Sequence, residues 1–327
     1  MTVLVTGATG FLGRRIVARL QREGVQVRAL VRPGRATLPP DVDPYVGDLG
    51  DEAAIAAAVS GVDGVVHAGA RVETSGRWEE FADVNIRGTR RVIRAARAAG
   101  VGCIVHISSL SVYDVARDGV TITEDSAYES EANARGHYSR SKLAADRLAL
   151  AAARAGARVV VLRPGLLYGP GKRPPLARQS FAVKGWRLIL ARPDYPLPLS
   201  YVDNAADAVW LALRQPEAVG QAFTVVDDNV RQNMLVSLYR AASGEVWRPV
   251  FLPVRVVALV ACLAERGLRL ARRRSPISYH QVRRATDRAW YDCSRAERVL
   301  GWRPAVSVEE GLHRCFSAPA TAGGQTP

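Results

Sequence analysis

The chain has 327 residues, of which 48% are apolar, and a formal net charge of +14. This length and apolar content are typical of one large globular domain or of a large domain with a smaller partner. The four cysteines, Cys103, Cys262, Cys293 and Cys315, are widely spaced, which excludes a disulfide scaffold and a zinc site and favours a cytoplasmic protein.

The positive charge is distributed along the chain, apart from one dense arginine run at 266–274. No zinc-finger or aromatic-rich RNA-binding pattern accompanies this run. The charge therefore favours general solubility, or attraction to anionic phosphates or to a membrane surface, over specific nucleic-acid recognition. The N-terminal MTVLVTGATG has no basic segment before its apolar residues, so it is not expected to be a signal peptide.

Strand-like and helix-like segments alternate from the N-terminus. Apolar strands are predicted at 2–7, 25–31, 64–70, 103–109 and 158–165, and helices at 11–24, 51–61, 81–100 and after Tyr138. Strands that are apolar at every position and separated by helices indicate a parallel sheet buried on both faces. The predicted fold class is α/β, a Rossmann-type doubly wound parallel sheet with a smaller, mainly helical C-terminal substrate region.

The alternation loosens after residue 165. Glycine- and proline-rich loops are expected at 167–175 and 193–199, and helices near 204–213, 232–242 and 254–270. A short helix, a turn at 301–304 and a last helix complete the pattern. We therefore predict a dinucleotide-binding domain over 1–165, its sheet completed by later segments, a substrate-binding region over 166–318, and a disordered tail over 319–327.

The segment 254–274 is apolar over too short a stretch to span a bilayer before its charges begin. It is interpreted as a lid helix over an apolar substrate, and peripheral membrane contact through its basic end is the alternative.

Three glycines, Gly7, Gly10 and Gly13, lie in TGATGFLG between the first strand and the first helix. Glycines at this place let the backbone turn sharply and approach a pyrophosphate, whose charge is met by the N–H groups of the helix N-terminus. The residues assigned to the dinucleotide in this loop are Gly7, Thr9, Gly10, Phe11, Leu12 and Gly13.

The end of the second predicted strand indicates the form of the cofactor. An acidic side chain there bonds the ribose hydroxyls of NAD, whereas an arginine accommodates the 2′-phosphate of NADP. Arg32 follows Val31 and no acid is present, so NADP is preferred over NAD. Asp48, followed by Leu49 in the stretch VGDL, is assigned to the adenine, with a helix N-cap as the alternative role.

The stretch YSRSK places Tyr138 four residues before Lys142, at the start of a segment rich in helix formers. The two side chains should therefore lie one turn apart on the same helix face. The same spacing recurs at Tyr168 and Lys172, but the intervening Gly-Pro-Gly breaks a helix. A cation one turn away, together with the positive nicotinamide ring of the oxidised cofactor, favours a phenolate and brings the pKa of Tyr138 toward the working pH, as an acid/base requires.

Taken together, TGATGFLG, GDL, HAGA, VNIRGT, ISSLSVY, YSRSK, LRPGLLYGPG, YVDNAADA and LGWRPAVSVEEGL resemble the extended short-chain dehydrogenase/reductase family. The segments follow in order over nearly the whole chain. The resemblance is closest to the branch of 3β-hydroxysteroid dehydrogenase-like enzymes, dihydroflavonol-type reductases and nucleotide-sugar epimerases and dehydratases.

The resemblance implies roles for individual residues. Tyr138 is implied as the acid/base, Lys142 as its activator and a ligand of the nicotinamide ribose, and Ser109, four residues before Tyr113, as the hydroxyl that aligns the substrate. Asn85 is implied to hold the lysine from behind. The remaining cofactor-binding residues implied are His67, Ala68, Gly69, Ala70, Ser108, Pro164, Gly165 and Leu166. No metal is expected. Arg163 and Asp203 match positions with structural roles.

The predicted function is an NAD(P)-dependent oxidoreductase that interconverts a secondary alcohol and a ketone. Leu110 stands where the 4,6-dehydratases carry an acid, which disfavours that dehydration. A nucleotide-sugar 4-epimerase with tightly bound NAD and a non-catalytic nucleotide sensor stay open as alternatives. The expected partner is a small-molecule substrate, lipidic or a nucleotide sugar, without specific nucleic acid, and a homodimer is ordinary for this fold.

Overall fold

The computed structural model describes residues 1–34, 38–73, 75–115, 119–130, 136–172, 180–189, 192–252 and 289–317. Its elements in chain order are β1 (Thr2–Thr6), α1 (Phe11–Arg22), β2 (Gln26–Val31), β3 (Val42–Val46), α2 (Glu52–Val59), β4 (Gly64–His67), α3 (Trp78–Phe81), the π-helical η1 (Ala82–Arg87), α4 (Gly88–Ala98), β5 (Cys103–Ile107), the 3-10 turn η2 (Leu110–Val112), β6 (Val120–Ile122), α5 (Gly136–Arg154), β7 (Val159–Pro164), β8 (Leu166–Tyr168), β9 (Ser180–Val183), β10 (Trp186–Ile189), β11 (Pro196–Tyr201), α6 (Val202–Arg214), the 3-10 turn η4 (Pro216–Ala218), β12 (Ala222–Val225), β13 (Asp228–Arg231), α7 (Gln232–Ser243), β14 (Arg248–Phe251), β15 (Ala289–Tyr291), the π-helical η5 (Ala296–Leu300) and α10 (Val308–Ser317).

A seven-stranded parallel sheet forms the centre of the molecule, in the order β12-β7-β5-β4-β1-β2-β3. The central strands β4, β5 and β7 are buried on both faces, as the continuous apolar runs predicted, whereas the edge strand β3 is partly exposed. The predicted doubly wound α/β fold is therefore confirmed. The edge strand β12 was not predicted as a strand, because its four residues lie far along the chain between a turn and a hairpin.

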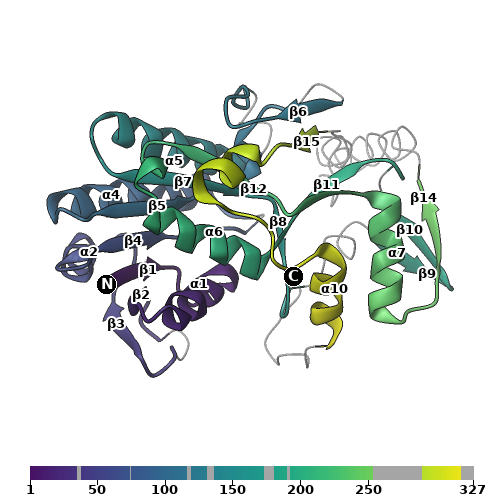
Figure 1. Ribbon diagram of the computed structural model, residues 1–327, viewed down its shortest axis with the longest axis horizontal. Helices are drawn as coiled ribbons and strands as arrows, with labels where there is room; N and C mark the ends of the chain where they lie inside the picture. The colour runs from purple at the N-terminus through teal and green to yellow at the C-terminus, as the bar shows by residue number, and fades with distance from the viewer. Residues whose placement is uncertain are drawn as a thin grey trace, which may run out of the picture.

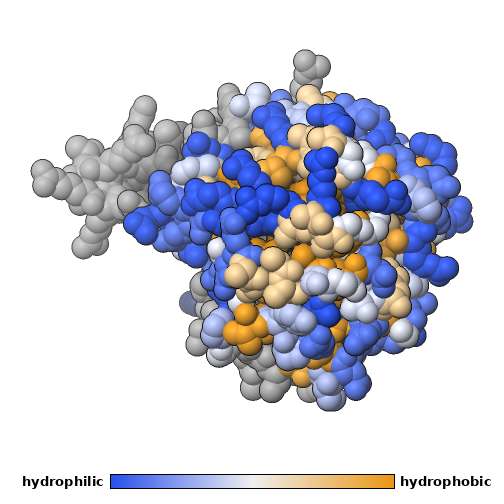
Figure 2. All heavy atoms as spheres, turned by 90° about the vertical axis from the view of Figure 1, so that its left-hand side faces the viewer, coloured by the Kyte–Doolittle hydropathy of each residue, from blue (hydrophilic) through white to orange (hydrophobic). Residues whose placement is uncertain are grey.

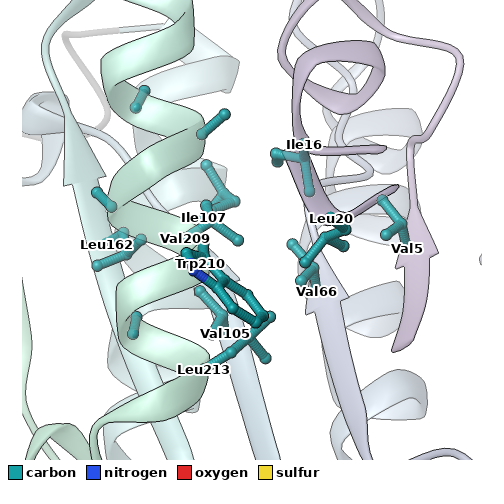
Figure 3. Packing of buried hydrophobic residues seen from close by; sticks show 14 of the residues in the cluster. Val5, Ile16, Leu20, Val66, Val105, Ile107, Leu162, Val209, Trp210 and Leu213 are labelled. Atoms are coloured by element: carbon teal, nitrogen blue, oxygen red, sulfur yellow. The ribbon is translucent and has the colours of Figure 1, made fainter. Parts of the chain in front are cut away.

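Helices cover both faces of this sheet (Figure 1), with α1 and α6 on one face and α2, α4 and α5 on the other. Apolar residues recur on α1 at helical spacing, so Ile16 and Leu20 face Val5 and Val66, as Figure 3 shows. Each side chain of this size contributes about 1.5–3 kcal/mol when fully buried. The same figure shows Trp210 of α6 packed among strand residues of the sheet.

Two ion pairs join α1 to α6. Arg15 makes a bidentate pair with Asp203, at 2.5 and 2.6 Å, and Arg19 pairs with Asp207 one turn further on. The interpretation of Asp203 as a residue of fold contacts is thus confirmed. These contacts fix the first helix of the chain against a helix from its second half.

The region after residue 165 contains more strand than expected. In its described residues, helices α6, α7 and α10 are accompanied by two small sheets, β14-β10-β9 and β13-β11-β8, and β15 pairs with β6 from the first half of the chain. The proline-rich stretch expected to be a loop is largely β11. Pro196 and Pro198 pair with β13 alone, and β8 joins only from Leu199 onward. A proline is tolerated where one side of its strand makes no ladder hydrogen bond.

The segment 254–274, Cys262 and the tail 319–327 lie outside the described residues, and so do the predictions made for them. Among the residues that are described, no helix combines the length and apolar character needed to cross a membrane. On the side of the molecule at the left of Figure 1, hydrophilic side chains surround a band of apolar ones (Figure 2).

The strand order reverses between β1 and β4, from which the chain winds outward in both directions. In open α/β sheets, ligands bind beyond the carboxyl ends of the strands at such a switch point. The glycine loop after β1 and the HAGA segment after β4 both lie there.

Candidate active site

The loop between β1 and α1 is a close-packed backbone cradle. A Cβ on Gly13 would lie 1.9 Å from the Gly7 carbonyl oxygen, and one on Gly7, where φ is +72°, would lie 2.8 Å from Gly69. Only glycine fits at either place. No side chain caps α1 and its first turn carries no acid, so its N–H groups are available to an anion. The cradle fits a dinucleotide pyrophosphate.

The other predicted loop residues take different positions around this cradle. Thr9 and Phe11 are partly exposed and Gly10 is exposed, whereas the side chain of Leu12 is buried in the core. Leu12 therefore has only its backbone to offer a ligand.

His67 lies inside a continuous hydrogen-bond chain. The Gly69 N–H donates to Thr6 Oγ1 at 3.1 Å, Thr6 Oγ1 lies 2.8 Å from His67 Nδ1, and His67 Nε2 lies 2.9 Å from Thr89 Oγ1, which donates to the Asn85 carbonyl. These partners suit a neutral ring protonated on Nε2. Burial, and then the charge of Lys142, lower the pKa of His67 to about 3.

The His67 ring therefore holds the ends of β1 and β4 together, and both its nitrogens are engaged by the protein. The three residues that follow, Ala68, Gly69 and Ala70, are partly exposed. Their lining of the cofactor, implied by the resemblance, stays a prediction.

Asn85 extends this chain to α5. Its side-chain amide donates to the Arg71 carbonyl at 3.0 Å and to Ser141 Oγ at 2.8 Å, and its Oδ1 accepts from the Arg71 N–H at 2.7 Å. Ser141 Oγ donates in turn to the Tyr138 carbonyl at 2.8 Å. The side chain of Asn85 thus supports the first turn of α5, which includes Tyr138, and Lys142 lies one turn further along the same helix.

Tyr138 and Ser109 are brought together by the fold. Tyr138 lies near the start of α5, Ser109 directly before the 3-10 turn that follows β5, and their side chains form a hydrogen bond. Burial raises the pKa of Tyr138, and the hydrogen bond with Ser109 acts against that rise. The expected lowering of the Tyr138 pKa depends on Lys142 together with the ring of the oxidised cofactor, and it stays a prediction.

Lys142 is 5% exposed and its Nζ donates to the Ile107 carbonyl at 2.5 Å. Burial lowers the pKa of this amine to about 8, against the charge of Asp146, which raises it. An ammonium group is thus held under the end of β5, one helical turn from Tyr138.

Ser108 points to the opposite side from Ser109, into a buried ion pair. Its Oγ donates to Asp146 Oδ1 at 2.5 Å, and Arg163 donates to both oxygens of Asp146, at 3.0 and 2.8 Å. Asp146 and Arg163 are 0% and 1% exposed. Burial by itself would lower the pKa of Arg163, but the hydrogen bond with Asp146 and the charge of Asp146 outweigh burial and raise the pKa of Arg163. The Ser108 hydroxyl is therefore committed to the protein interior.

Several predicted cofactor residues lie at the rim of the site. Arg32 is exposed at the end of β2. The Asp48 carboxylate accepts from the Gly50 N–H at 2.7 Å, and the N-cap of α2 is Asp51, so the N-cap alternative for Asp48 is wrong. Leu49 packs between Gly69 and Gly88, where it would meet an added Cβ at 3.2 and 2.9 Å.

Residues at the end of β7 form another side of the site. Pro164 ends that strand, and the Gly165 N–H donates to Ser200 Oγ at 2.8 Å. A Cβ on Gly165 would lie 2.4 Å from the Pro198 carbonyl oxygen. Leu166 is 40% exposed, so its side chain is accessible to a ligand.

The sequence reasoning missed the residues that support this site, namely Thr6, Thr89, Arg71, Ser141, Tyr128 and Asp146. Asp146 had one signal, because it lies four residues after Lys142 and so shares its helix face. The others are single polar residues without a distinguishing pattern. Among the described residues, no group of three His, Cys, Asp or Glu side chains is arranged to hold a metal.

The glycine cradle at the helix N-terminus, the Tyr138–Ser109 pair and the buried lysine define an enzyme that binds a nicotinamide dinucleotide. The sequence profile of the NAD-dependent epimerase/dehydratase family matches residues 3–226. The chain belongs to this family, and the resemblance inferred from its motifs is confirmed.

The relatives are reductases, dehydrogenases and epimerases. The chain is 31% identical to a 2-alkyl-3-oxoalkanoate reductase of Stenotrophomonas maltophilia, over 98% of this chain and 100% of the relative. It is 28% identical to a 3β-hydroxysteroid dehydrogenase/Δ5→4-isomerase of Mycobacterium tuberculosis, over 96% and 89%. Among solved structures, MoeE5 in complex with UDP-glucose and NAD superposes with a TM-score of 0.72 at 25% identity, covering 97% of each chain.

Proposed function

We propose that this protein is an NAD(P)-dependent oxidoreductase that interconverts a secondary alcohol and a ketone. The observation that carries the proposal is the hydrogen bond between Tyr138 and Ser109 beside the buried ammonium of Lys142. These groups lie at the edge of the sheet where the glycine cradle also opens. A proton donor, a hydroxyl and a fixed charge are what carbonyl reduction requires.

The bound nicotinamide supplies the hydride for reduction and accepts it in the reverse reaction. Tyr138 donates its Oη proton to the carbonyl oxygen of the substrate, and Ser109 Oγ donates a hydrogen bond to the same oxygen, where negative charge gathers. The raised pKa of Tyr138 keeps it protonated at neutral pH, as a donor must be. The charge of Lys142 then stabilises the phenolate that remains.

We further propose an apolar substrate. The names of two relatives specify an oxo group on an alkyl chain and a hydroxyl on a steroid. The exposed Leu166 beside the site supports an apolar contact of the same kind. A 3-oxoacyl compound with a long alkyl chain is therefore the first substrate to test, with NADH or NADPH oxidation followed by absorbance.

For the cofactor, we propose that NADP binds more tightly than NAD, because Arg32 is exposed at the end of β2 where the 2′-phosphate would lie. Separate titrations with NADPH and NADH test this preference. Arg32→Gln should weaken NADPH binding about tenfold and leave NADH binding nearly unchanged, since only the former gives up an ion pair. Tighter NADH binding to the wild-type protein would contradict the assignment.

The decisive test of the reaction is the Tyr138→Phe variant, which should bind cofactor normally and lose turnover by at least a hundredfold. The matched control is Tyr168→Phe, because Tyr168 also precedes a lysine by four residues. The Tyr168 hydroxyl is buried and has no hydrogen-bond partner among the described residues. Unchanged turnover in Tyr138→Phe would refute the proposed mechanism.

The alternatives give different results in the same experiments. A nucleotide-sugar 4-epimerase would retain NAD through purification and convert UDP-sugars without a net absorbance change, and a nucleotide sensor would bind cofactor without turnover. A cytoplasmic location and a homodimer stay proposals. The apolar band in Figure 2 supports a homodimer, and light scattering of the purified protein tests it.

A further inference from the structure

The tight turn that follows β8 packs against the glycine cradle. The Lys172 N–H donates to the Gly169 carbonyl at 3.0 Å, and the two residues form an isolated antiparallel bridge. A Cβ on Gly169 would lie 2.6 Å from Val202 Cγ1 and 3.5 Å from Phe11 Cζ. The turn is therefore wedged between the start of α6 and the start of α1.

This packing places the side chain of Lys172 over the phosphate-binding end of α1. Its Nζ lies 5.1 Å from the centroid of the Phe11 ring. Phe11 is the first residue of α1 and directly follows the uncapped Gly10. A positive charge from the second half of the chain thus lies against the side chain of the first residue of α1.

Arg14 and Arg15, near the start of α1, already have partners in the protein. Arg14 Nε donates to the Thr9 carbonyl at 3.0 Å, and Arg15 forms its bidentate pair with Asp203. A pyrophosphate carries two negative charges, and the partial charge of a helix N-terminus is about half of one. A further cation at the cradle would therefore strengthen binding.

We propose that Lys172 is a phosphate clamp, which pairs its ammonium with the pyrophosphate of the bound dinucleotide. The contact with the Phe11 ring holds the side chain near this position, and a charge-assisted hydrogen bond to phosphate is stronger than this cation–π contact. The inference rests on the dinucleotide cofactor of the proposed function. It assigns a role in cofactor affinity to the second Tyr-Lys copy, whose spacing alone indicated no catalytic pair.

The test is the dissociation constant of NADPH and of ADP-ribose, measured by fluorescence or calorimetric titration for wild type, Lys172→Met, Lys172→Arg and Lys172→Glu. Lys172→Met should weaken both ligands about tenfold, Lys172→Glu should weaken them further, and Lys172→Arg should stay within threefold of wild type. Adenosine, which lacks phosphate, should bind all four proteins equally. The matched control is Lys184→Met, which removes an exposed lysine on the β9–β10 hairpin.

Each contrary result has a distinct meaning. If the wild-type protein binds NADPH and the affinity is unchanged in Lys172→Met and Lys172→Glu, the clamp is overturned and the proposed function is not. Equal weakening of adenosine would overturn it as well, since the variant would then act by distorting the site. Failure of the wild-type protein to bind both NADPH and ADP-ribose would overturn both the clamp and the proposed function.

Discussion

Replacing Asp146 by asparagine should lower the free energy of unfolding by about 3–5 kcal/mol, the range found when one partner of a buried ion pair is removed. The carboxylate accepts hydrogen bonds from Ser108 Oγ, from Tyr128 Oη and from two nitrogens of Arg163. Asparagine keeps one of the two oxygens and turns an NH₂ group toward these donors. Arg163, 1% exposed, would then be buried without a counter-charge.

This loss is a large part of the roughly 5–15 kcal/mol that stabilises a typical native protein. Urea unfolding, followed by the fluorescence of the six tryptophans, gives the midpoint and slope from which the change is calculated. The matched control is Glu52→Gln, which breaks a pair with Arg94 whose side chains are 57% and 65% exposed. That substitution should change stability by about 0–1 kcal/mol.

A double variant separates the pair from the packing around it. Asp146→Leu with Arg163→Met removes both charges, and should be less destabilised than the sum of the single variants, because neither charge remains unpaired. A loss below about 1 kcal/mol in Asp146→Asn, similar to that in Glu52→Gln, would refute the reasoning. Strict additivity in the double variant would do the same.

Three further substitutions test the site. Gly13→Ala should weaken cofactor binding at least tenfold in a fluorescence titration, because its methyl group would lie 1.9 Å from the Gly7 carbonyl oxygen, whereas Gly61→Ala, which meets no atom within 4 Å, should leave affinity unchanged. His106→Leu should stabilise the protein more at pH 5 than at pH 8. Burial holds the pKa of His106 well below 6.5, so in the wild type only the unfolded state takes up a proton as the pH falls through 6.5. Equal gains in stability at both pH values would contradict this account. Lys142→Met should abolish turnover. In urea unfolding, the wild type should gain stability relative to this variant as the pH rises from 8 to 10.5, because the pKa of Lys142 is about 8 in the fold and the unfolded chain keeps its proton to higher pH. A stability difference that stays constant over this pH range would argue against a lowered pKa.

The main fold could be predicted because its signals are local and repeated. Continuous apolar strands alternating with amphipathic helices require a parallel sheet covered on both faces. The strands β8 and β11 were missed for a physical reason. β8 has only three residues, and β11 contains two prolines, so its pairing depends on which neighbours the tertiary fold supplies.

The candidate site was predicted in part for the same reason. Tyr138 and Lys142 share a helix face by periodicity, and the glycine loop follows from its strand and helix. Ser108 and Ser109 are adjacent in the sequence, yet one turns into the Asp146–Arg163 pair and the other toward Tyr138. Adjacent residues at a strand end point to opposite sides, and the sequence does not say which side faces the ligand.

By itself, the sequence determined the fold class, the dinucleotide loop and the Tyr-Lys pair, because each depends on residues within one or two turns or on one strand–loop–helix unit. The tertiary structure alone decided what holds these parts in register. Arg15 meets Asp203 across 188 positions, and Asp146 meets Arg163 across 17. It also placed Lys172 over Phe11. Such contacts are set by how helices and strands pack, and single polar residues carry no periodic signal that announces a distant partner.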